Sequence, residues 1–95
     1  MKVDITARHC SPSEQLKDMV YEKLKKIEKF NRDIMYCRVI LTKESNCEDV
    51  EIVVNGKGNH FVANENSDNF EKSLICAIDK ITIQIKKQHE KLINH

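Results

Sequence analysis

The chain has 95 residues, of which 33% are charged and 40% hydrophobic, and its formal net charge is +1 at pH 7. This length fits a single domain, residues 1–95, and excludes a second core of comparable size. The composition is that of a folded globular protein, and no apolar run approaches the ~20 residues of a membrane span.

The first half of the sequence predicts a strand followed by a helix. In residues 2–9, Val3, Ile5 and Ala7 alternate with polar residues, which is typical of a strand with one dry face. Ser11 is the expected N-cap of a helix, with Glu14 completing the S-x-x-E capping box. The helix should end near residues 30–31, where its apolar stripe stops; the stripe consists of Leu16, Met19, Val20, Leu24 and Ile27.

Three further strands are expected over residues 35–43, 49–55 and 60–65. The second and third of these are joined by an Asn-Gly-Lys-Gly hairpin, in which the Asn-Gly pair favours positive φ angles. The polar residues 64–69 predict a turn with capping side chains ahead of the last helix.

The last element is a long amphipathic helix over residues 68–92. Its apolar residues recur at steps of three, four and seven: Phe70, Leu74, Ile78, Ile81, Ile85 and Leu92. At ~1.5 Å per residue, about 24 residues make a rod of roughly 36 Å. A rod of this length should overhang the sheet that it covers.

The element order β-α-β-β-β-α predicts an α+β two-layer sandwich. Each strand alternates apolar and polar residues, so one face of the four-stranded sheet should be covered by both helices and the other should be wet. A helical crossover joins the first two strands, which should be parallel if they are adjacent.

Charge is distributed unevenly along the chain. Residues 70–95 contain five Lys and three acids, whereas residues 31–69 contain four Lys or Arg and seven acids. If both helices pack on one face, their outward lysines should form one cationic surface that binds several phosphates of an RNA. Simple solvation of these side chains is the alternative. The residues concerned are Lys23, Lys26, Lys29, Lys80, Lys86, Lys87 and Lys91, with Arg8 as an addition.

No motif in the chain indicates catalysis or a bound cofactor. His9 and Cys10 are adjacent, so on an extended chain they point in opposite directions and rarely hydrogen-bond. Asp49 and Glu51 share a strand face, which solvation explains. The four cysteines show neither C-x-x-C nor zinc-ligand spacing, so free thiols and no metal site are expected. No signal peptide is recognisable, and a cytoplasmic location is expected.

Taken in order, several segments resemble the ribosome hibernation promoting factors, a family that also includes ribosome-associated inhibitors, ribosomal subunit interface proteins and sigma-54 modulation proteins. The resemblance covers nearly the whole chain and looks like a short form of the family. Its marks are Ile5-Thr6, residues 23–30, Asn55-Gly56-Lys57, Ser67-Asp68-Asn69, and the run from Asp79 to Leu92.

The resemblance implies a fold similar to double-stranded RNA-binding domains and a protein that is not an enzyme. It implies binding to rRNA and ribosomal proteins of the small ribosomal subunit, in the decoding channel for mRNA and tRNA, and repression of translation by steric occlusion. By position, the implied rRNA contacts are Lys23, Lys26, Lys29, Lys80, Lys87 and Lys91. No membrane or small-molecule substrate is implied.

The chain departs from the family pattern at Glu71 and Ile75, where a tyrosine and an aspartate are usual. Three questions stay open at this point. The first is whether this chain, as the resemblance to short forms implies, promotes pairing of ribosomes with the help of a separate modulation factor. A general double-stranded RNA-binding module is a second interpretation, and a protein-interaction domain that modulates a sigma factor is a third.

Overall fold

Alternating apolar residues build the strands, and two apolar helical stripes cover them. The structure, a computed structural model, describes residues 1–31 and 33–93, without the side chains of residues 30 and 91–93. The elements in order are β1 (Lys2–Arg8), α1 (Glu14–Phe30), β2 (Ile34–Lys43), β3 (Glu48–Gly56), β4 (Asn59–Ser67) and α2 (Phe70–Ile93). This is the predicted order β-α-β-β-β-α.

The four strands lie in the order β1-β2-β3-β4. The pair β1–β2 is parallel, as the helical crossover predicts, and the pairs β2–β3 and β3–β4 are antiparallel. Register aligns apolar residues in rows across the sheet, for example Ile5, Val39, Ile52 and Ala63. Such rows give the sheet one continuous apolar face.

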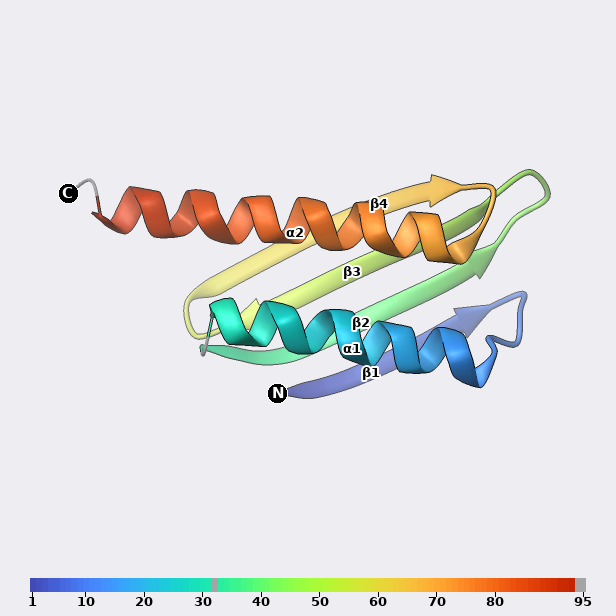
Figure 1. The fold of residues 1–95 in the computed structure, drawn as a ribbon, viewed down its shortest axis with the longest axis horizontal. Helices are drawn as coiled ribbons and strands as arrows, with labels where there is room; N and C mark the ends of the chain where they lie inside the picture. The colour runs from blue at the N-terminus through green and yellow to red at the C-terminus, as the bar shows by residue number, and fades with distance from the viewer. Residues whose placement is uncertain (32, 94–95) are drawn as a thin grey trace.

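Both helices cover that face and run in the same direction (Figure 1). Helix α2 packs on β3 and β4, while α1 packs on β2 and against α2. Fully buried side chains from both helices and the sheet form one core, among them Leu24, Leu41, Ile52 and Ile81. The predicted α+β sandwich is therefore confirmed. The C-terminal turns of α2 extend beyond the sheet (Figure 1), as the helix length predicted.

The N-cap of α1 is Ser13, so the prediction of Ser11 is wrong. Ser13 has an extended backbone, and its hydroxyl accepts a hydrogen bond from the amide of Leu16 at 3.1 Å. That amide is the third of the helix, which is the donor a serine N-cap satisfies. Ser11 and Pro12 remain in the connection after β1.

Strand β4 is longer than the predicted 60–65, because it runs to Ser67 and residues 66–67 are strand where only a turn was expected. Glu48 and Asp49 of β3 pair with Ser67 and Asn66, and Asn64 Nδ2 donates to Asp49 Oδ2 at 2.8 Å. A partner strand of the same length therefore outweighs the low strand propensity of asparagine.

Two smaller expectations also need correction. The positive φ angle of the β3–β4 turn lies at Gly58 (78°), not in the Asn-Gly pair. Ala7 lies in the row with buried Leu41, yet it is exposed, because β1 is an edge strand.

The fully buried Cys37 makes stability depend on pH in the alkaline range. Burial raises the pKa of its thiol to about 11, with a further contribution from the Glu28 carboxylate. In the unfolded chain the thiol titrates near its ordinary value of 9.0, so the folded state holds the proton to a higher pH. The stability contributed by the neutral thiol should therefore be fully present below about pH 9 and be lost as pH rises towards 11.

Urea unfolding at about pH 8 and pH 10 measures this effect. Wild type should lose more stability over that interval than Cys37→Ala, by at most about 1.4 kcal/mol per pH unit for one proton. Equal losses in the two proteins would show that the Cys37 proton is not linked to folding.

Candidate nucleic-acid interface

The two ends of the sandwich carry different connections (Figure 1). We call the end with residues 44–47 and the first turns of both helices the loop end. The other, the hairpin end, carries the β3–β4 turn at Lys57-Gly58 and the C-terminal halves of both helices. The long axis of the molecule joins these two ends.

Lysines towards the loop end are held by carboxylates. Four pairs form there: Lys17–Glu14 at 3.4 Å, Lys43–Glu48 at 3.8 Å, Lys72–Asp68 at 3.3 Å and Lys80–Glu65 at 2.7 Å. These ammonium groups are partly neutralised, so they are poor candidates for binding phosphate.

Lysines towards the hairpin end behave differently. Among the side chains that the structure describes, no carboxylate lies within ion-pair distance of Lys23, Lys25, Lys26, Lys29, Lys57, Lys86 or Lys87. On α1 these lysines follow the acids Glu14, Asp18 and Glu22 in sequence. Acids near a helix start and cations near its end are also the arrangement that the helix dipole favours.

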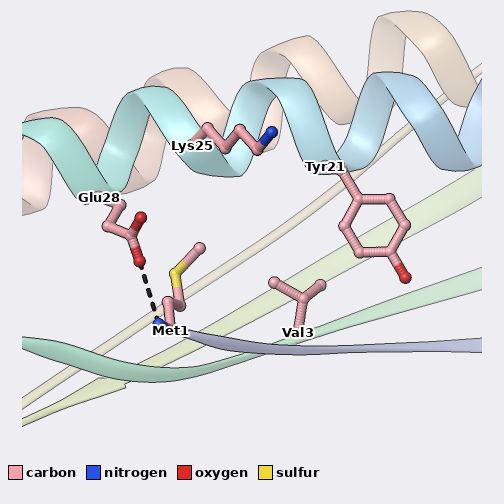
Figure 2. Close-up of a pocket in the computed structure, with 5 residues that line it drawn as sticks. All are labelled: Met1, Val3, Tyr21, Lys25 and Glu28. Atoms are coloured by element: carbon pink, nitrogen blue, oxygen red, sulfur yellow. Dashed lines mark ion pairs between the residues drawn. The ribbon is translucent and has the colours of Figure 1, made fainter.

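The one acid in the basic half of α1 is occupied elsewhere. Figure 2 shows Glu28 turned towards the start of β1, where its Oε2 lies 3.2 Å from the amino nitrogen of Met1. Lys25 and Tyr21 belong to the same wall of this shallow hollow (Figure 2). Glu28 is therefore compensated without using a lysine of the hairpin end.

The β3–β4 hairpin is tied to both neighbouring elements. The amide of Lys57 donates to the Asp33 carbonyl at 3.0 Å, and Gln88 Nε2 of α2 donates to Asn59 Oδ1 at 2.8 Å. A Cβ at Gly56 would lie 2.7 Å from the Asp33 carbonyl oxygen, so only glycine permits this approach. The turn is thereby fixed between the α1–β2 connection and the distal half of α2.

The predicted residues of α1 all lie in its basic half: Lys26 and Lys29 are exposed, and Lys23 is half-buried. On α2, Lys86 and Lys87 are exposed near the hairpin end. Lys91 lies within α2, but its side chain is outside the described part of the chain. Arg8 is exposed at the end of β1, towards the loop end and away from these lysines.

Lys80 does not join the lysines of α1. The alternation of β4 places Glu65 on the helix-covered face, in one row with Leu41 and Val50. A carboxylate there needs a cation, and Lys80 supplies it from the flank of α2 that lies over β4. Lys87 follows seven residues later and therefore shares that flank, whereas Lys86 is turned by about 100° towards the outside.

Two lysines of the hairpin end lie outside the predicted set: Lys25 of α1, and Lys57, which is exposed at the hairpin turn. The position of Lys57 in a two-residue turn was visible in the Asn-Gly-Lys-Gly sequence. What the sequence did not show is that the turn lies beside the basic halves of the two helices, because these contacts join segments that are far apart along the chain.

The residues considered for catalysis have structural contacts instead. The Cys10 thiol donates to the Leu41 carbonyl at 3.7 Å, and the Asp49 carboxylate accepts from Asn64. Within the described residues, no group of three or more His, Cys, Asp or Glu side chains is placed to hold a metal ion. No helix in the described ranges combines the length and apolar character needed to cross a membrane.

Comparison with known proteins identifies the family of the chain. The sequence pattern of the family described as "Sigma 54 modulation protein / S30EA ribosomal protein" matches residues 3–93. The chain belongs to this family. Among curated members, the ribosome hibernation promoting factor of Pseudomonas putida is 31% identical over 91 residues, covering 96% of this chain and 89% of that protein. The corresponding factor of Azotobacter vinelandii is 28% identical over 93 residues, covering 98% of this chain and 87% of that protein.

Solved structures agree in fold. A ribosomal subunit interface protein from Coxiella burnetii superposes with a TM-score of 0.88 at 21% identity, covering 95% of this chain and 99% of that one. The N-terminal domain of Thermus thermophilus Protein Y superposes with a TM-score of 0.83 at 19% identity, covering 92% of this chain and 98% of that one. The resemblance seen in the sequence is confirmed at the level of the family and of the fold.

Proposed function

We propose that this chain is a ribosome hibernation factor. It binds the small ribosomal subunit in the channel that mRNA and tRNA use, and it represses translation by occupying that channel. The observation that carries the proposal is the family match over residues 3–93, together with curated relatives named ribosome hibernation promoting factors. Residues 1–95 act as one ribosome-binding domain in the cytoplasm, where ribosomes are found.

The geometry supports contact with rRNA phosphates. Lys23, Lys26 and Lys29 of α1 and Lys86 and Lys87 of α2 lie towards one end with no carboxylate at ion-pair distance among the described side chains. Phosphates repel one another, so a surface that holds several of them needs a cation for each. Lys91, a further predicted contact, follows Lys87 by four residues in the sequence. Occupancy alone blocks the channel, so the mechanism requires no bond to be made or broken.

Lysine is also the cation suited to this role. It binds phosphate as a point charge and does not read a base edge with the bidentate geometry of arginine. Binding would therefore follow the shape of the phosphate backbone, with ribosomal proteins lining the rest of the site. Pairing of ribosomes with a separate modulation factor stays an expectation from the family resemblance.

Co-sedimentation with purified small subunits tests the proposal. The protein should pellet with empty subunits and stay in the supernatant when the subunits are first loaded with mRNA and tRNA. Raising salt from about 50 to 200 mM should weaken binding by orders of magnitude, because several phosphate contacts are involved.

Two results would count against the proposal. Equal co-sedimentation with loaded and empty subunits would place the protein outside the channel. Binding that does not respond to salt would favour protein contacts over rRNA, as expected for the interpretation as a protein-interaction domain.

A further inference from the structure

We propose that the domain docks on RNA end-on, through the hairpin end, with the β3–β4 turn as a third contact beside the two helices. This inference rests on the proposed function and specifies its docking surface and the kind of RNA that fits. The docking surface consists of the basic half of α1, the turn at Lys57 and the distal half of α2.

The uneven charge along the long axis disfavours a lengthwise approach. The lysines of the loop end are bound by Glu14, Glu48, Glu65 and Asp68. Further acids of that end are Glu44, Asp49 and Glu71. An RNA lying along the molecule would bring its phosphates against these carboxylates, whereas at the hairpin end the lysines outnumber the carboxylates of Glu28, Asp33 and Glu90.

The turn at Lys57 is placed for this role by rigid contacts. Its amide is bound to the Asp33 carbonyl at 3.0 Å, four residues beyond Lys29 along the chain. On the other side, Gln88 of α2 holds Asn59 at 2.8 Å, next to Lys86 and Lys87 in sequence. Three segments that are far apart along the chain thus present lysines at one end, and the absence of a Cβ at Gly56 permits the approach.

The dimensions of the molecule define the partner. Its principal extents are 46 × 23 × 17 Å, so its end offers 23 × 17 Å and its side 46 Å. A double-stranded RNA-binding domain spans about 16 base pairs and two successive minor grooves of a duplex. The small hairpin end cannot span two grooves of a bare duplex. It fits a compact folded RNA in which phosphates from several strands surround a short cleft.

A matched pair of charge reversals tests the docking surface. Lys57→Glu and Lys72→Glu change the net charge equally, and both lysines are exposed, but they lie at opposite ends. Lys57→Glu should weaken binding to small subunits about tenfold and reduce the slope of log affinity against log salt by about one. Lys72→Glu should bind within about twofold of wild type. Circular dichroism melting of both variants controls for folding.

The outcomes separate this inference from the proposed function. If wild type binds small subunits but Lys57→Glu binds equally well, or Lys72→Glu is weakened as much, end-on docking is wrong while the function stands. If wild type does not bind small subunits at all, the proposed function fails first.

Duplex length gives a second, independent test. Wild type should bind RNA duplexes of about 8 and 16 base pairs with similarly weak affinity, at least 100-fold below that for small subunits at the same salt. A large gain on lengthening the duplex, to an affinity near that for small subunits, would overturn end-on docking. That result would favour a lengthwise general double-stranded RNA binder.

Discussion

Reversing the charge of Lys26 and Lys87 together is expected to abolish binding to the small ribosomal subunit. On the proposed surface, each substitution to glutamate would remove one lysine–phosphate attraction and add a repulsion at the same place. Both side chains are exposed, and neither has a carboxylate within ion-pair distance among the described side chains, so their charge is available to RNA in wild type. We expect Lys26→Glu/Lys87→Glu to bind at least about 100-fold more weakly, which corresponds to roughly 2.7 kcal/mol.

The matched control is Lys43→Glu/Lys72→Glu, which changes the net charge by the same amount at the loop end. Both of those lysines are paired with carboxylates, Glu48 and Asp68, so little phosphate binding should be lost. The measurement is co-sedimentation with small subunits over a protein concentration series at fixed salt. Similar losses in the two double variants would mean that net charge, not the position of the lysines, governs binding.

Truncating Ile81 is expected to have the largest effect on the fold itself. Its side chain is fully buried in the single core, between α2 and the sheet. Ile81→Ala removes three carbons and leaves a cavity, which typically costs about 2–5 kcal/mol. Native proteins have a free energy of unfolding of only about 5–15 kcal/mol, so this variant should lose a large fraction of its stability.

Ile83 provides the matched control, because it is the same residue type two positions further along the same helix. Its side chain is 51% exposed, so Ile83→Ala should change stability by less than about 1 kcal/mol. Urea unfolding of both variants measures the difference. Equal losses would show that the core of α2 is not where the structure places it.

Much of the fold was predictable because period and burial coincide. Alternation in residues 35–43 and 49–55 identified β2 and β3, and their inward residues Val39, Leu41, Val50 and Ile52 are all fully buried. The helical spacing of Leu74, Ile78, Ile81 and Ile85 likewise identified the buried face of α2. These patterns are local consequences of backbone geometry, so a short window of sequence contains them.

One error occurred where a distant segment decides the local structure. Residues 66–67 were expected to be turn, but pairing with β3 makes them strand, so a strand partner outweighs their turn-like composition. The error at the N-cap of α1 is local: Ser13, not Ser11, has the extended backbone and accepts the amide of Leu16.

By itself the sequence determined the order of the elements, the apolar faces of both helices and the family to which the chain belongs. Tertiary structure alone decided which lysines are available to a phosphate. Lys80 and Lys87 lie on the same flank of α2, yet Lys80 is bound to Glu65 because the alternation of β4 turns that carboxylate under the helix. Lys57 lies beside the basic ends of the helices because Gly56 lets the hairpin approach Asp33. Ion pairing acts through distances of a few ångströms between residues that are remote in sequence, so only the folded chain sorts its lysines between its two ends.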